Sequence, residues 1–160
     1  MAHLDLVRLF LDIATKKKWE VHHMHMKTTF LNGEVGEAVY VAQPAGIASS
    51  PMLSKVLRLH KALYGLHQAL RAWNTKLDSV LVTLGITRSP SEHDLYTCGE
   101  DVEQLLLGVY VDDLIPIGAC TNIISKFKEK MSCKFCTCDL GLHKLYLGIE
   151  VKQAPQVITL

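Results

Sequence analysis

The sequence lacks several features that would assign it to a specialised class of protein. None of its apolar runs approaches the roughly 20 residues that span a bilayer, and the opening MAHLDLVRLF lacks the charged-then-apolar layout of a signal peptide. It contains no internal repeat and no low-complexity segment. These absences argue against a membrane, secreted or repeat protein, and we expect an intracellular location.

An excess of one charge is also missing. The 160 residues carry a formal net charge of +1, so the strong positive footprint of a self-sufficient nucleic-acid-binding protein is absent. The clearest basic patch is the run Lys16, Lys17 and Lys18. A composition of 49% hydrophobic and 21% charged residues is typical of one globular domain, which we assign to residues 1–160.

The cysteines do not indicate a disulfide framework. They are odd in number and crowded near one end of the chain: Cys98, Cys120, Cys133, Cys136 and Cys138. We interpret them as reduced thiols. The spacing C-x-x-C-x-C, with histidines only at the distant positions 22, 23 and 25, does not match the paired ligands of structural zinc sites, so zinc is not expected.

Apolar periodicity and turn residues predict a mixture of helices and strands. Helices are expected over residues 4–14, 62–84 and 121–132, with Thr121 as the cap of the third. Strands are expected over residues 19–26, 39–41, 114–118 and 144–152, and on both sides of a turn at 99–101. Asn32-Gly33 predicts a β-hairpin or loop excursion. This order predicts an α+β fold with helices on one face of a sheet.

Two adjacent aspartates interrupt the most apolar part of the chain. Residues 105–118 read LLLGVYVDDLIPIG, and Asp112 and Asp113 would repel each other and lose hydration unless a cation or an exposed turn compensates them. A strand, two aspartates and a returning strand predict a tight hairpin with both carboxylates at its tip. Such a tip can bind divalent cations, although Asp-Asp alone is more often a solvated turn.

Several other segments stand in an order and spacing that resemble one family. They are TTFLNGE (28–34), VYVAQPAG (39–46), KALYGLHQALRAW (61–73), YVDD (110–113) and DLGLHKLYLGIEV (139–151). With them the sequence resembles, over about residues 4–152, the reverse transcriptase of copia-type LTR retrotransposons. The resemblance implies a polymerase palm, a ferredoxin-like antiparallel sheet with helices on one face, without complete fingers and thumb.

The resemblance also implies a metal site. In the family, two metal ions bridge the primer 3′-hydroxyl and the nucleotide phosphates, which makes Asp112 and Asp113 the expected catalytic ligands of Mg²⁺ or Mn²⁺. The implied partners are an RNA or DNA template–primer and deoxynucleotides. The implied location is a cytoplasmic virus-like particle or the nucleus, and the sequence does not determine the oligomeric state.

Further residues match positions of the family that contact the nucleotide or primer. Phe30 resembles the aromatic steric gate that excludes a ribose 2′-hydroxyl, although from the residue alone a core phenylalanine is equally consistent. Tyr110, Gln68 and Arg71 are assigned to nucleotide binding by the same resemblance. Residues 147–148 resemble the primer-grip turn, and an ordinary strand is the alternative.

The sequence departs from the family at its first catalytic position. Where the family has an aspartate, in a stretch like LDVKTAFLNG, this chain reads MHMKTTFLNG and has His25. An imidazole supplies no negative charge for magnesium, so we expect a weak or inactive polymerase; whether Glu34 or Glu150 replaces the carboxylate stays open. A non-enzymatic nucleic-acid-binding or interaction remnant is the alternative. Pro116, which removes a backbone donor, is expected on an edge strand.

Overall fold

The structure is a computed structural model that describes residues 4–44, 55–146, 149–150, 152–154 and 157–159. The chain divides into two compact units. The first combines residues 1–27 with residues 78–160, and the second contains residues 28–77. That residues 1–160 act as one palm domain stays a prediction.

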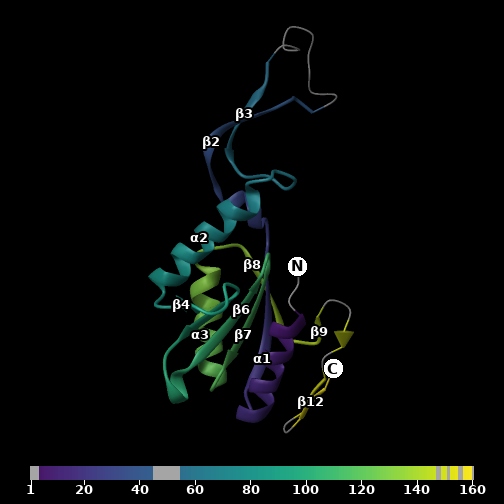
Figure 1. The fold of residues 1–160 in the computed structure, drawn as a ribbon, viewed down its shortest axis with the longest axis vertical. Helices are drawn as coiled ribbons and strands as arrows, with labels where there is room; N and C mark the ends of the chain where they lie inside the picture. Colours follow the sequence, from purple (N-terminus) through teal and green to yellow (C-terminus); the bar gives the residue numbers. More distant parts are fainter. Residues whose placement is uncertain (1–3, 45–54, 147–148, 151, 155–156, 160) are drawn as a thin grey trace. The chain divides into compact units, whose positions relative to one another are not determined.

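Helices and strands alternate as in a mixed α/β protein (Figure 1). The described α-helices are α1 (Leu4–Lys17), α2 (Ala69–Thr83) and α3 (Thr121–Ser132), with 3₁₀ helices at Thr29–Asn32 and Asp101–Glu103. The longer strands are β1 (Glu20–Met26), β2 (Glu34–Val41), β3 (Leu57–Lys61), β5 (Leu95–Cys98), β6 (Leu105–Tyr110), β7 (Asp113–Gly118) and β8 (Thr137–Leu142). The shorter strands are β4 (Thr87–Arg88), β9 (Leu145–Tyr146), β10 (Ile149–Glu150), β11 (Lys152–Ala154) and β12 (Val157–Thr159). Each helix in the described residues is too short or too polar to cross a membrane.

The first unit is built on a six-stranded antiparallel sheet with the order β4-β5-β6-β7-β1-β8. β6 and β7 form a hairpin in which Leu105 pairs with Gly118 and Tyr110 pairs with Asp113. β1, which comes far earlier in the chain, lies between β7 and β8. The centre of the sheet therefore joins segments that are about 90 residues apart in sequence, as the pairing of His25 with Asp113 shows.

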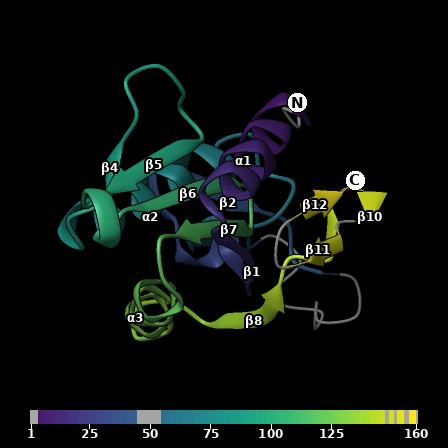
Figure 2. The same cartoon turned by 90° about the horizontal axis from the view of Figure 1, so that it is seen from below.

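Helices cover both faces of this sheet, which corrects the prediction of helices on one face. Phe10, Leu11 and Ala14 of α1 form a buried cluster with residues of β1, β6 and β7, namely Val21, Leu106, Ile115 and Ile117. On the opposite face, Ile124 of α3 packs on Gly118, and Figure 2 shows α1 and α3 on either side of the sheet. Because successive residues of β6 and β7 are apolar, both faces need a cover.

One predicted helix start and one predicted helix cap are wrong for local reasons. α2 begins at Ala69 and not at residue 62, because Gly65 has a φ of +90° and the preceding segment forms turns. α3 begins at Thr121 as predicted, but its N-cap is Cys120. The hydroxyl of Thr121 instead donates to Oε2 of Glu20 at 3.2 Å.

Pro116 lies in an interior strand, contrary to the expectation of an edge. It belongs to β7, between β6 and β1, and pairs with Leu107 of β6. The paired positions of β1 and β7 on either side of it are Val21 with Ile117 and Met24 with Leu114. Pro116 leaves one position of β7 without a backbone N–H donor. The proline is tolerated because β7 pairs with β1 on both sides of that position.

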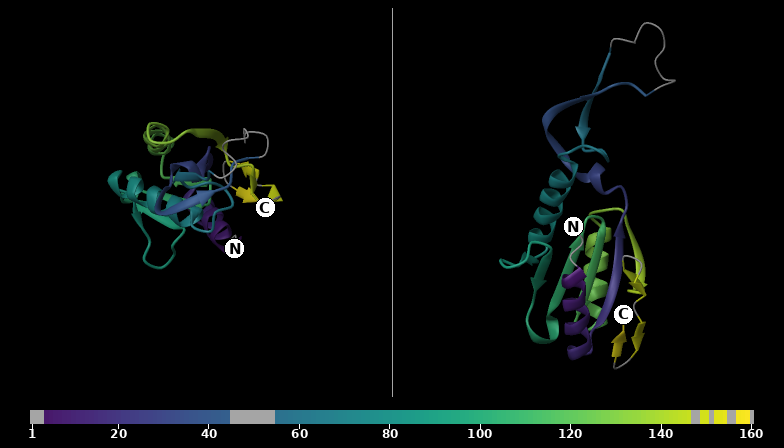
Figure 3. Two further views of the ribbon diagram at one scale, coloured as in Figure 1. Left: turned by 90° about the horizontal axis from the view of Figure 1, so that it is seen from above. Right: turned by 45° about the vertical axis from the view of Figure 1, so that its right-hand side comes forward.

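The second unit contains the antiparallel pair β2–β3, seen as a two-stranded ribbon in Figure 3. Asn32-Gly33 does not form the turn of this pair. Gly33 follows a 3₁₀ helix with a φ of −80°, and a side chain there would meet the backbone of Ala72 and Trp73 at 2.9–3.0 Å. Close packing against α2, and not turn geometry, therefore requires a glycine at this position.

The remaining sequence predictions concern the cysteines and the end of the chain. All five cysteines are free thiols, as predicted. The strand expected over residues 144–152 is instead the short antiparallel pair β9–β10, followed by the pair β11–β12. The primer-grip match at 147–148 lies outside the described residues.

Candidate metal centre

A two-residue turn presents the first aspartate. Val111 and Asp112 connect β6 to β7, and the carbonyl oxygen of Asp112 accepts a hydrogen bond of 2.7 Å from the backbone N–H of Met26. Val111 has a φ of +52°, an uncommon conformation that costs a β-branched residue about 1–3 kcal/mol. The buried strands on both sides impose this strain, so the tip is held in place at the end of β1.

Two histidines of β1 contact the second aspartate. Oδ1 of Asp113 lies 2.8 Å from Nε2 of His23 and 3.1 Å from Nδ1 of His25. An ionised carboxylate can only accept hydrogen bonds, so both ring nitrogens carry a proton in these contacts. His23 and His25 face the same side because they are two positions apart on one strand.

The histidines keep Asp113 ionised. Burial raises the pKa of its carboxyl, but the hydrogen bonds and charges of His23 and His25 lower it by more, so the pKa lies below its ordinary value. The side chain of Asp113 is 30% exposed and that of His25 is 41% exposed. The site is therefore a partly open, anionic carboxylate held between two imidazoles.

A third histidine supports the cluster from the protein interior. His143 is 1% exposed, and its ring meets that of His23 edge-on with a centroid distance of 5.1 Å. Burial, and secondarily the neighbouring His23, lowers the pKa of His143 to about 4, so it is neutral at pH 7. The amide of Gln153 donates to the carbonyl oxygens of His143 and Val21 at 2.9 and 2.8 Å, tying this segment to β1.

The sequence pattern predicts no role for His23, His143 or Gln153. The alternation along β1 could have indicated His23, because it shares a face with His25. No local signal indicates His143 or Gln153, which reach the cluster only through tertiary contacts.

The donor set fits one divalent cation better than two magnesium ions. One donor atom from each of His25, Asp112 and Asp113 lies within 4.8 Å of the others. In the described part of the chain no third carboxylate joins this group; Glu34 belongs to the second unit, and the side chain of Glu150 is not described. Magnesium is usually held by one or two carboxylates together with water and substrate phosphates, so the two carboxylates of this group match the protein ligands of a single ion.

The other residues predicted from the sequence are distributed over both units. Tyr110 is half-buried and pairs with Asp113 at the end of β6. In the second unit, Phe30 is half-buried and its ring lies 5.7 Å from that of Tyr64 between centroids. There Gln68 is half-buried just before α2, and Arg71 is exposed in its first turn. Their assignment to nucleotide binding stays a prediction.

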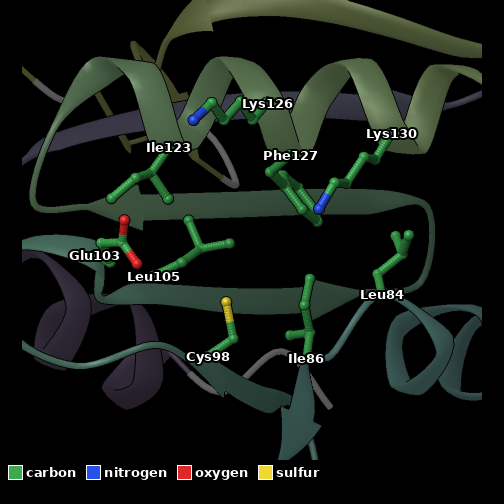
Figure 4. Close-up of a pocket in the computed structure, with 9 residues that line it drawn as sticks. All are labelled: Leu84, Ile86, Cys98, Glu103, Leu105, Ile123, Lys126, Phe127 and Lys130. Carbon is green, nitrogen blue, oxygen red and sulfur yellow. The ribbon is translucent and has the colours of Figure 1, made fainter.

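A separate pocket lies between α3 and the sheet (Figure 4). It has a volume of about 210 Å³ and is lined by Leu84, Ile86, Cys98, Glu103, Leu105, Ile123, Lys126, Phe127 and Lys130. Burial raises the pKa of the Cys98 thiol, and the nearby Lys130 only partly counteracts this. No member of the histidine–aspartate cluster lines this pocket, so it is not part of the candidate site.

Comparisons with known proteins give consistent matches. The family model described as "Reverse transcriptase (RNA-dependent DNA polymerase)" matches residues 1–160. The chain is 32% identical over 150 residues to the "Retrovirus-related Pol polyprotein from transposon RE2" of Arabidopsis thaliana, covering 94% of this chain and 10% of that protein. It is also 32% identical over 146 residues to the corresponding polyprotein "from transposon TNT 1-94" of Nicotiana tabacum, covering 91% and 11%. The chain thus spans about a tenth of these relatives, and no solved structure matches it.

Proposed function

Because the chain belongs to the reverse transcriptase family found in copia-type retrotransposon Pol polyproteins, we propose that residues 1–160 form the palm of an RNA-directed DNA polymerase. The observation that carries this proposal is the cluster of His25, Asp112 and Asp113 at the tip of a buried hairpin. Its substrates are a template–primer of RNA or DNA and deoxynucleotides. Its place of action is a cytoplasmic virus-like particle or the nucleus.

Each predicted residue has a role in this proposal. Asp112 and Asp113 hold a divalent cation, and the two histidines that contact Asp113 keep it ionised. Phe30 acts as the steric gate against a ribose 2′-hydroxyl. Tyr110, Gln68 and Arg71 contact the nucleotide or the template.

We further propose that His25 impairs catalysis. It pairs directly with Asp113 across the sheet, at the position where the family has its first carboxylate. The chain therefore has one fewer anionic ligand than a pair of magnesium ions needs. Metal ions supply several kcal/mol of transition-state stabilisation, so losing one ion would slow nucleotide addition by a factor of about 10³ or more.

A second function, nucleic-acid binding without catalysis, is favoured by the same residue. A palm with His25 could keep a basic surface for nucleic acid while its polymerase chemistry is lost. The exposed Lys16 and Lys18 at the end of α1 and just beyond it are candidates for phosphate contacts. Such binding would weaken with salt and would not require a divalent cation.

Primer extension on an RNA template tests the proposal. We expect slow or undetectable extension by the chain with Mg²⁺ or Mn²⁺, faster extension by the His25→Asp variant, and none by His25→Asp combined with Asp112→Asn. Equal rates for the chain and for His25→Asp would refute the impairment. Salt-sensitive binding of the template–primer by all variants, with extension by none, would support the second function.

A further inference from the structure

His25 adds a nitrogen donor to the two carboxylates of the cluster. Its Nδ1 carries a proton toward Oδ1 of Asp113. In neutral histidine the lone pair then resides on Nε2. A carboxylate that holds one ring N–H while the other nitrogen binds metal is the usual arrangement around metal-ligating histidines. The side chain of His25 is 41% exposed, so an ion from solvent can reach it.

The oxygen donors of the cluster are limited in number. Asp113 already shares Oδ1 between two imidazole N–H groups, which partly neutralise its charge. Asp112 is half-buried, and in the described residues its carboxylate makes no ion pair. The cluster thus combines one imidazole nitrogen with two carboxylates, of which only Asp112 is fully available to a cation.

This donor set disfavours magnesium. Mg²⁺ prefers an octahedron of oxygen ligands and gives up its water reluctantly, whereas Mn²⁺, Co²⁺ and Zn²⁺ accept imidazole nitrogen together with carboxylate oxygen. We propose that His25, Asp112 and Asp113, the last of which also orients His25, bind a single divalent first-row transition-metal ion in preference to Mg²⁺. This inference rests on the proposed cation site at Asp112 and Asp113, and it names the kind of ion that the site takes.

The direct test compares metal selectivity between variants, without an activity assay. Mn²⁺ binding is measured by electron paramagnetic resonance, and Mg²⁺ affinity by competition. We expect the preference for Mn²⁺ over Mg²⁺ to fall about tenfold or more in His25→Asp, because the new ligand is a hard anionic oxygen. His93→Ala, which changes an exposed histidine elsewhere in the first unit, is the matched control and should keep the ratio of the unmodified chain.

A second measurement needs no variant, in case a substitution in this interior strand prevents folding. Mn²⁺ should broaden the ring resonances of His25 and His23 at concentrations that leave His93 sharp. Co²⁺ should give weak visible bands typical of nitrogen and oxygen ligands. Cys138 of β8 is the cross-strand neighbour of His25 and could offer a thiolate ligand. Intense thiolate charge-transfer bands would therefore show a different ligand set and would overturn the proposal.

The outcomes separate this inference from the proposed function. An unchanged Mn²⁺ preference in His25→Asp, with metal binding still lost in Asp112→Asn, would refute the nitrogen ligand and leave the cation site standing. Metal binding that survives Asp112→Asn unchanged would refute both.

Discussion

The β6–β7 hairpin and the β2–β3 hairpin are both antiparallel pairs, yet they differ completely in burial. The residues from Leu105 to Val109 and from Leu114 to Gly118 are all buried, whereas none of β2 or β3 is. Large hydrophobic side chains on the β2–β3 pair are exposed to solvent: Tyr40 is 57% exposed and Leu57 is 47% exposed. The two hairpins therefore depend on side-chain packing to very different degrees.

This difference explains where the candidate site is placed. A hairpin packed on both faces has few alternative positions, so its tip can hold Asp112 and Asp113 in a defined geometry, even with the strained Val111 between the strands. A hairpin with open faces gains little from burial. Substitutions at matched positions of the two hairpins can test this contrast.

The largest expected difference is between two leucines. Leu107 of β6 is 0% exposed, so Leu107→Ala should destabilise the protein by about 2–5 kcal/mol through lost burial and a residual cavity. Leu57 of β3 is 47% exposed, and Leu57→Ala should change stability by about 0.5 kcal/mol or less. Urea denaturation followed by circular dichroism measures both. Comparable losses would contradict the contrast.

A smaller difference is expected between two glycines. A Cβ at Gly108 would collide with the ring of Phe10, so Gly108→Ala should destabilise by about 1–3 kcal/mol through overpacking. A Cβ at Gly36 of β2 meets nothing within 4 Å, so Gly36→Ala should be neutral or stabilising by up to about 1 kcal/mol. Thermal unfolding compares the two. Adding Phe10→Leu should partly rescue Gly108→Ala, and failure of this rescue would point to another cause.

The smallest expected effect lies at the exposed edge of the six-stranded sheet. Nζ of Lys128 lies 2.6 Å from Oδ1 of Asp139 on β8. Burial raises the pKa of Asp139, but the hydrogen bonds from Lys128 and from the backbone N–H of Gly141, together with the charges of Lys128 and His22, lower it by more, so the folded pKa lies below the unfolded value of about 3.9. The resulting stability is present above that value and is lost as the pH falls through the folded pKa.

Lys128→Met should therefore make acid destabilisation shallower, by less than about 1 kcal/mol because the side chain of Asp139 is 53% exposed to solvent. Denaturation midpoints measured from pH 7 down to about pH 3 would show it. Lys126→Met, on the same helix, is the control and should keep the original pH dependence. If the denaturation midpoint falls with decreasing pH in the same way in both variants, the Lys128–Asp139 pair has no role in the acid destabilisation.

The sequence predicted features that depend on local patterns. The strand around residues 19–26, the turns before β6 and β7, and α3 follow from apolar alternation, turn residues and helical spacing, and the structure confirms them. Where tertiary packing competes with local preference, the predictions failed. Gly65 delays the start of α2 to Ala69, Gly33 serves close packing against α2, and Pro116 lies inside the sheet.

By itself, the sequence determined the family, the pair of aspartates at a hairpin tip and the substitution of His25 for a carboxylate. These features depend on residue identity and short-range spacing, which can be read from the sequence without a structure. Only the tertiary structure decided that β1 lies beside β7, and hence that His23 and His25 contact Asp113 while His143 packs behind them. Pairing between strands about 90 residues apart is set by burial of both sheet faces, and no local pattern encodes it.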